Sequence, residues 1–193
     1  MKRTAFALAL ALATGLAVAA PVTYRIDPNH TSVTASWSHY GFSNPIAHFG
    51  EVAGSITYDA ARPANSSVDV TIPLSGLESH VDAFNDHLRS ADFFDAATYP
   101  EMTFRSTKVQ PNGKGRLKVT GDLTIRGVTR PAVLDVTINR IGVQPRANRP
   151  AAGFHATTTL KRSDFGLGKH APAVSDAVTI RITTQAVVPR PAG

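Results

Sequence analysis

The chain has no cysteine among its 193 residues. This absence excludes structural disulfides, metal sites built on thiolates and cysteine nucleophiles. It also excludes attachment of a lipid to an N-terminal cysteine. We therefore expect the folded protein to depend on a packed apolar core for its stability.

The sequence also lacks the short motifs that accompany common catalytic and cofactor sites. It contains no H-E-x-x-H, no G-x-S-x-G, no phosphate-binding P-loop and no G-x-G-x-x-G. Among its seven histidines, His30, His39 and His48 are too widely spaced to form a local pair of metal ligands. These absences predict a protein without catalytic activity, bound metal or cofactor.

Negative charge is comparatively scarce. The 14 Asp and Glu against 20 Lys and Arg give a formal net charge of +6. Clustered basic residues are typical of nucleic-acid-binding proteins, but here they occur as singles and pairs, and the single Trp and four Tyr form no stacking series with them. We therefore expect no nucleic-acid partner, while attraction to anionic membrane surfaces stays open.

The first 20 residues, MKRTAFALALALATGLAVAA, have two basic residues, then an apolar run from Ala5 to Leu12, then small residues. This order is typical of a secretory signal peptide, and cleavage after Ala19 fits the small-residue rule. The apolar run is short for a membrane-spanning helix. The sequence predicts a signal peptide at residues 1–19, export to the periplasm, and one soluble domain at residues 20–193.

Apolar and polar residues alternate through most of the remaining chain, in segments bounded by Gly, Pro and Asn, as strands and turns require. About eight strands are expected, with a loop between Ile141 and Phe154, where prolines occur and periodicity is absent. Short connections predict an all-β antiparallel meander that either stacks as a sandwich or closes as a barrel. The positions that share one face of their strands are Val33, Ala35, Trp37, His39, Val52, Ile56, Tyr58, Val68, Val70, Ile72, Met102, Phe104, Ser106, Leu117, Val119, Leu123, Ile125, Ala132, Leu134, Val136, Ile138, Phe154, Ala156, Thr158, Leu160, Val178, Ile180 and Ile182.

One segment changes to a helical period. Ser79 followed by Asp82 resembles a capping box, and the residues behind it predict one short helix. His87 and Asn85 flank its apolar face on opposite sides. The residues on that face are Val81, Phe84, Leu88 and Ala91.

Four runs occur in a characteristic order: DPNHTSV (Asp27 to Val33), HLRSADFFDAATYPEMTFRST (His87 to Thr107), GDLTIRGVTRP (Gly121 to Pro131) and RSDFG (Arg162 to Gly166). With these runs the chain resembles the YceI-like family of exported bacterial proteins, from Tyr24 to Ala186. The resemblance implies an eight-stranded antiparallel lipocalin-like barrel with one short helix near a barrel end. It also implies a long hydrophobic lumen for an isoprenoid lipid of polyprenyl or quinone type. Leu123 and Ile125 would then face the lumen, and Asp122, Thr124 and Arg126 would face water.

On this basis we expect the helix to close the barrel, with His87 or Asn85 near the polar end of the ligand. One of Phe93 and Phe94 is expected to pack inward. Two alternatives stay open. The predicted ligand-binding side chains only pack the barrel end, or the protein is an envelope stress or interaction protein with a filled barrel and no lipid. The oligomeric state is not determined by the sequence. The predicted ligand-binding residues are Trp37, His39, Phe42, Val81, Phe84, His87, Leu88, Phe93 and Phe94.

Overall fold

The computed structural model describes residues 20–191, so the predicted signal peptide at residues 1–19 lies outside the described residues. No helix within residues 20–191 is long and apolar enough to cross a membrane. The strands are β1 (Val22–Ile26), β2 (Ser32–Ser36), β3 (Ile46–Phe49), β4 (Ala53–Tyr58), β5 (Ser67–Pro73), β6 (Leu77–Glu78), β7 (Glu101–Pro111), β8 (Arg116–Ile125), β9 (Val128–Gln144), β10 (Arg149–Lys161) and β11 (Ala177–Val187). The α-helix is α1 (Asp82–Arg89), and the 3-10 helices are η1 (Pro28–His30), η2 (Pro63–Asn65), η3 (Leu74–Gly76) and η4 (Arg162–Phe165).

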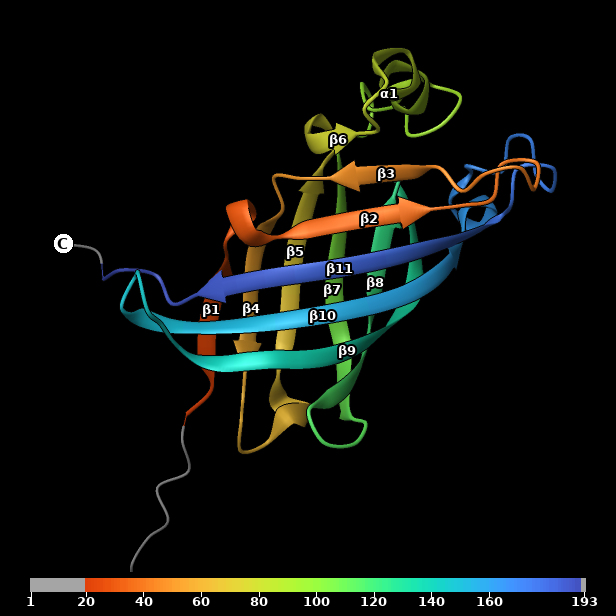
Figure 1. Ribbon diagram of the computed structural model, residues 1–193. Coiled ribbons are helices and arrows are strands. Elements are labelled where there is room, and N and C mark those ends of the chain that lie inside the picture. The colour runs from red at the N-terminus through yellow and green to blue at the C-terminus, as the bar shows by residue number, and fades with distance from the viewer. Residues whose placement is uncertain (1–19, 192–193) are drawn as a thin grey trace, which may run out of the picture.

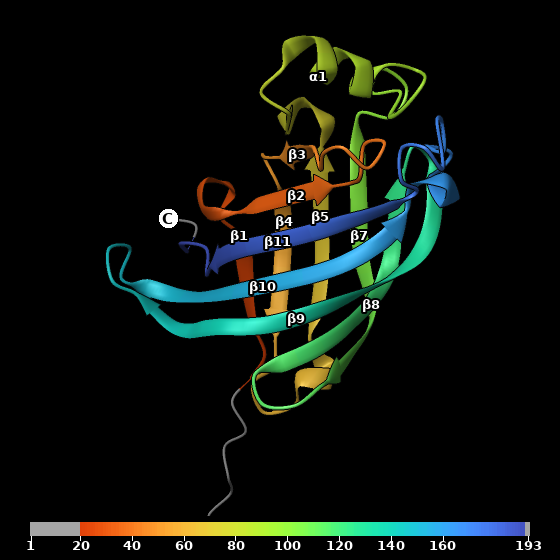
Figure 2. The ribbon, with the colours of Figure 1, turned by 45° about the vertical axis from the view of Figure 1, so that its right-hand side comes forward.

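Eight of the strands form a closed antiparallel barrel. Their order is β1-β4-β5-β7-β8-β9-β10-β11, and pairing of β11 with β1 closes the ring. In Figures 1 and 2, strands β9 to β11 cross in front of β1, β4, β5 and β7, and α1 lies beyond one end. The predicted eight-stranded antiparallel barrel with one helix near its end is confirmed.

The first two strands, β1 and β2, pair with different parts of β11. Strand β1 pairs with Ala186 and Val187, whereas β2 pairs with residues 179–183 and continues the sheet to β3 and β6. Between β1 and β2 lies η1, where Pro28 has no backbone N–H to donate and the Asp27 carboxylate accepts from Asn29 N. The sequence analysis did not predict β1, β3 or β6, which have five, four and two residues.

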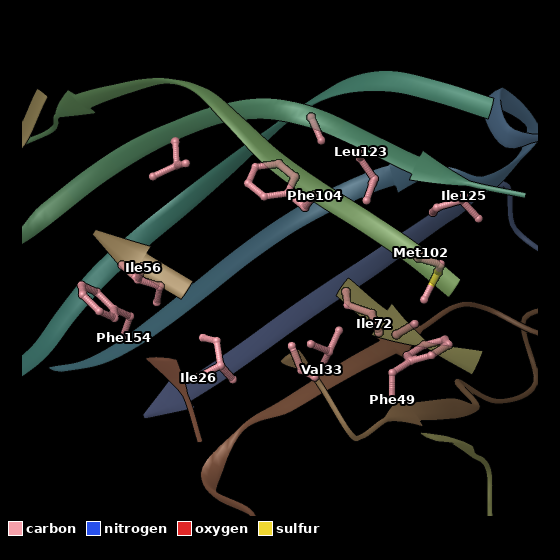
Figure 3. Close-up of a cluster of buried hydrophobic side chains, with 14 of the residues drawn as sticks. Ile26, Val33, Phe49, Ile56, Ile72, Met102, Phe104, Leu123, Ile125 and Phe154 are labelled. Atoms are coloured by element: carbon pink, nitrogen blue, oxygen red, sulfur yellow. The ribbon is translucent and has the colours of Figure 1, made fainter. Parts of the chain in front are cut away.

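Strand β8 illustrates how alternation builds the lumen. Leu123 and Ile125 are buried and Asp122 is exposed, as predicted. Gly121 also points inward, and a Cβ atom there would lie 2.5 Å from the ring of Phe104. Only glycine therefore leaves room for the Phe104 ring across β8. Figure 3 shows Phe104 and Leu123 on one wall, with Ile26 and Val33 on strands across from them.

The predicted loop between Ile141 and Phe154 is wrong. Strand β9 continues to Gln144 and β10 begins at Arg149, which leaves residues 145–148 as the turn. The register shifts where Gly153 pairs with Arg140 and Phe154 with Ile138, so β9 has one extra residue there and its apolar positions change parity between Ile138 and Ile141. Figures 1 and 2 show this hairpin extending past the barrel, and its apolar residues Ile141 and Val143 are exposed.

The helix forms where predicted, but the predicted capping box is wrong. Val81 is the N-cap residue and its side chain makes no capping bond, while Ala91 lies beyond the C-terminus of α1. Ser79 instead donates from its backbone N and its Oγ to Asn85 Oδ1, both at 2.7 Å. The Asn85 amide donates to Glu78 Oε1 at 3.0 Å. Asn85 is buried, so these bonds fix the helix to β6.

Candidate functional site

The lumen contains a cavity of about 510 Å³. The inner faces of β2, β4, β5 and β7 to β11 supply most of its lining, which is dominated by aliphatic and aromatic side chains. The ten residues labelled in Figure 3 all belong to this lining. Ligand sites for small apolar molecules have this size and this composition.

The end of the barrel opposite α1, which we call the far end, consists of the turns at residues 59–66 and 112–115. Beside these turns the rings of Tyr58 and Phe154 pack edge to face at 6.2 Å. Asp59 is fully buried, and its Oδ1 accepts from the backbone N–H groups of Ala61 at 3.0 Å and Arg62 at 2.8 Å. The far end is thus held by local hydrogen bonds.

The Asp59 carboxylate is stabilised in its charged form. The hydrogen bond from the Arg62 backbone is the main cause that holds the pKa of Asp59 below its ordinary value. Bonds from Asn65 and Ala61 lower this pKa further, whereas burial opposes them.

Apart from Ser67, the exposed lining residues gather at the other end, beside α1. They come from the β2–β3 loop, from α1 and from the loop after η4. The two loops are joined, because the backbone N–H of Tyr40 donates to the Ala173 carbonyl at 3.0 Å. We call the following residues the mouth: His39, Tyr40, His87, Lys169 and His170.

An aromatic cluster lies under α1 and brings most of the predicted residues together. The ring centroids of Trp37 and Phe84 are 6.0 Å apart, and those of His87 and Phe93 are 4.7 Å apart. Phe94 packs edge to face on Phe49 at 5.8 Å. Both Phe93 and Phe94 line the cavity, rather than one of them. The predicted residues that line the cavity are Trp37, His39, Phe84, His87, Leu88, Phe93 and Phe94.

Two predicted residues and one candidate headgroup residue lie elsewhere. Phe42 is 92% exposed at the tip of the β2–β3 loop. Val81 is 56% exposed, because its backbone is extended and helical spacing does not apply to it. Asn85 faces Glu78 and Ser79 rather than the cavity. None of these three side chains lines the lumen, contrary to the expectation.

Arg162 was missed as a site residue, although it begins the RSDFG run. Its guanidinium donates to the backbone carbonyls of Ser175 at 2.9 Å, Lys169 at 2.8 Å and Val174 at 2.8 Å, and also to that of Leu167. Burial lowers the pKa of Arg162. Because these bonds use the donors of the guanidinium, Arg162 shapes the loop that carries Lys169 and His170.

Arg126 was expected to face water but is half-buried. It donates to the carbonyl of Gly166 at 2.8 Å and to that of Ala91 at 2.8 Å. These bonds connect the turn after η4 to the segment after α1. Both sides of the mouth are therefore positioned by one side chain, which periodicity in the sequence could not reveal.

Lys169 forms an ion pair with Asp92, which follows α1. The hydrogen bond and the charge of Lys169 are the main causes that lower the pKa of Asp92, and His87 and His170 act in the same direction. Asp92 does not itself line the cavity. Within residues 20–191, no group of three or more His, Asp or Glu side chains could hold a metal ion.

Known proteins with similar sequences cover most of this barrel. The family model described as YceI-like domain matches residues 24–186. The chain is 38% identical to a UPF0312 protein of Vibrio parahaemolyticus over 170 residues, which cover 86% of this chain and 89% of that protein.

Two solved structures are similar. BcnA of Burkholderia cenocepacia has a TM-score of 0.76 and 28% identity, over 83% of this chain and 99% of that one. A polyisoprenoid binding domain from Saccharophagus degradans has a TM-score of 0.63 and 17% identity, over 86% of this chain and 98% of that one. At this low identity the second likeness shows the fold alone.

Proposed function

The chain belongs to the YceI-like domain family, and from this premise we propose that it binds an isoprenoid lipid of polyprenyl or quinone type. The observation that carries the proposal is the lumen itself. It is apolar along its length, and its solvent-exposed lining is concentrated at the mouth. Such a cavity suits a long apolar tail with a polar group at one end.

The cavity size supports a tail of a few isoprene units. An apolar cavity of about 150 Å³ holds one benzene molecule, so 510 Å³ corresponds to roughly 20 carbon atoms, or about four isoprene units. Burial of one methylene contributes about 0.8 kcal/mol, and micromolar affinity needs about 8 kcal/mol after association costs. Four units therefore provide enough apolar surface for stable binding.

Two further observations support a lipid over a filled barrel. A barrel filled by side chains would leave no space comparable to the cavity described here. The structural neighbour from Saccharophagus degradans carries the name polyisoprenoid binding domain, which agrees with the proposed ligand class. The proposed role is binding and transfer, without catalysis.

We also propose that the protein acts in the periplasm and exchanges its lipid with a membrane. The pattern of residues 1–19 supports export. Phe42 is exposed on the loop that also carries the mouth residues His39 and Tyr40, and Ile46 is exposed where β3 begins after this loop. Exposed apolar side chains beside the mouth are suited to contact with a bilayer surface.

The test is purification from the periplasm of the native host under mild conditions, followed by organic extraction and mass spectrometry. We expect about one prenyl lipid per protein chain. A delipidated sample should then rebind a prenyl lipid of about 20 carbons. An empty extract, together with failure to bind added prenyl lipids, would contradict the proposal and favour an interaction protein.

A further inference from the structure

The hairpin of β9 and β10 leaves one strand edge without a partner. Strand β8 pairs with β9 only as far as Thr137, and the next bond on this side runs from the Ile138 N–H to the Gly115 carbonyl at 2.8 Å. Beyond this point, no strand within residues 20–191 pairs with β9 on the side away from β10. We call residues 139–144 of β9 the free edge.

The open backbone groups of the free edge belong to Ile141 and Val143. The Pro150 carbonyl accepts from the Val188 N–H at 2.9 Å, so it points away from β9. In an antiparallel pair, two opposite residues point their backbone groups either toward each other or both outward, and the two cases alternate. Val143 is opposite Pro150, and Ile141 is opposite Ala152. Both residues therefore present an N–H and a C=O group to the open side, where another strand can pair with them.

The side chains of the free edge and its turn are apolar or basic. Ile141 is 40% exposed and Val143 is 53% exposed. Arg140 and Arg146 are exposed too, and neither forms an ion pair with any other described residue. The sequence contains no Asp or Glu at residues 136–163. The hairpin thus carries positive charge that no acid of its own strands balances.

A hollow of about 420 Å³ lies over the hairpin beside the free edge. Arg140, Gly142 and Gln144 line it from β9, and His30 and Gln185 line it from neighbouring segments. No Asp or Glu in the described part of the chain lines this hollow. An acidic side chain that entered it would meet the guanidinium of Arg140 and no competing carboxylate.

We propose that the free edge binds an extended acidic segment of a partner protein, which adds to β9 as a further strand. Backbone hydrogen bonds to Ile141 and Val143 hold the segment, and its apolar side chains cover theirs. Its acidic side chains lie on the other face, beside Arg140. In Figures 1 and 2 the tip of the hairpin lies on the opposite side of the molecule from the loop between β10 and β11, so the partner can bind without closing the mouth.

Two other occupants fit the free edge less well. A second copy of the chain would bring the arginines of two hairpins together, and neither hairpin has an acid to offset the repulsion. A bilayer would attract the arginines, but its hydrocarbon offers no partner for the open N–H and C=O groups of Ile141 and Val143. An acidic strand satisfies both the charge and the backbone.

The test uses a dye-labelled short peptide of alternating valine and glutamate, which is titrated with the full chain and followed by fluorescence anisotropy. In the proposed pairing the valines share a face with Ile141 and Val143 and their N–H groups bond to β9, whereas the N–H groups of the glutamates point away. N-methylation of the valines should therefore weaken binding by at least about tenfold, and N-methylation of the glutamates should be tolerated. A peptide of alternating valine and lysine should bind as weakly as the first of these.

Two variants of the chain test the same contacts from the other side. Val143→Pro removes an N–H group that no strand of the barrel uses, so the barrel should fold and peptide binding should fall by at least about tenfold. Arg140→Gln should weaken binding by about three- to tenfold, because it removes a charge-assisted hydrogen bond. Arg181→Gln is the matched control, since Arg181 is exposed on the outer face of β11. Binding of prenyl lipids should be the same in all three variants.

Each contrary result identifies what is wrong. Failure of the valine–glutamate peptide to bind, or equal binding after N-methylation of its valines, would overturn the proposal even if Val143→Pro did not fold. Self-association of the chain that Val143→Pro abolishes would overturn it in favour of a second copy. Weaker co-sedimentation of Val143→Pro with anionic vesicles would overturn it in favour of a bilayer. Lipid binding in the lumen is measured separately, so none of these results bears on the isoprenoid proposal.

Discussion

The two ends of the barrel are built in different ways. At the far end, Asp59 is fully buried and satisfies backbone N–H groups two and three residues further along the chain. At the mouth, Arg126 bonds carbonyls that lie 35 and 40 residues away, and lysine and histidine side chains stay exposed. Charge at the far end serves the fold, whereas at the mouth only the arginines do so, and the lysine and histidine side chains stay exposed.

This difference indicates which end can change without loss of the barrel. The far end belongs to the connections between ring strands β4, β5, β7 and β8, so its turns fix strand register. Helix α1 and the loop after η4 lie outside the hydrogen-bonded ring. We therefore expect variants of side chains exposed at the mouth or facing the lumen to affect binding first, variants of the buried arginine that shapes the mouth to affect stability as well, and variants at the far end to affect stability alone.

The largest expected effect is that of Arg162→Ala, which would disrupt the loop that carries Lys169 and His170 and leave the far end unchanged. It leaves four backbone carbonyls without their donor, and we expect a loss of roughly 3 kcal/mol in the free energy of unfolding. Urea unfolding followed by Trp37 fluorescence measures this loss. Arg181→Ala, on the outer face of β11, is the control and should change stability by less than about 0.5 kcal/mol. Equal losses for the two variants would refute the role of Arg162.

The next effect is on binding rather than stability. Leu88 is buried in α1 and lines the cavity, so Leu88→Asp places a charge against the tail and should weaken lipid binding by more than roughly tenfold. The barrel should remain folded, as judged by circular dichroism. Ala83→Asp puts the same charge on the exposed face of the helix and should bind lipid normally. Unchanged lipid retention by the Leu88 variant would count against α1 as part of the site.

A smaller effect tests the far end through its pH dependence. Since the pKa of Asp59 is lower in the folded chain than its ordinary value, the ionised carboxylate stabilises the fold above pH about 4. This contribution is lost as the pH falls through the folded-state pKa. Asp59→Asn should lower the urea midpoint at pH 7, and the difference from the unmodified protein should shrink below pH 4. Lipid binding at pH 7 should not change. If the difference in urea midpoint grew on acidification instead, the pKa of Asp59 would not be lowered in the folded chain.

The smallest expected effect concerns the outer surface of the mouth. Phe42→Ser removes an exposed ring and should reduce association with lipid vesicles by about three- to tenfold, because only part of one aromatic side chain is transferred from water. Co-sedimentation with vesicles measures it, and folding stability should be unaffected. Val133→Ser, at an exposed position on the barrel wall, serves as the control. An equal reduction in both variants would mean that the mouth is not the surface that meets the membrane.

The sequence predicted the barrel well where alternation is regular and long. Strand β8 keeps its parity from Leu117 to Ile125, and its inward residues were correctly identified. The hairpin of β9 and β10 was interrupted in the prediction, because the register shift after Ile138 changes the parity of β9 and the residues at the tip, 141–150, are not buried. The short strands β1, β3 and β6 were not predicted.

The candidate site was predictable to the extent that it depends on apolar residues. Trp37, Phe84 and Leu88 were expected in the lumen and lie there, because an apolar face must be buried. Phe42 was misplaced, since residues in a turn have no periodicity to orient them. Lys169 and His170 had no local signal at all, because long-range hydrogen bonds, among them those of Arg162, Arg126 and the Tyr40 backbone, bring their loop to the mouth.

By itself, the sequence determined the all-β class, the one helix and the apolar character of the interior, because hydrophobic periodicity is local and burial follows from it. The tertiary structure decided that the sheet closes into a ring, that a cavity remains inside it, and that basic side chains from three distant segments meet at one end. The physical reason is that closure and the grouping of charges depend on long-range pairing and on side-chain to backbone hydrogen bonds. Neither of these leaves a repeating pattern along the chain.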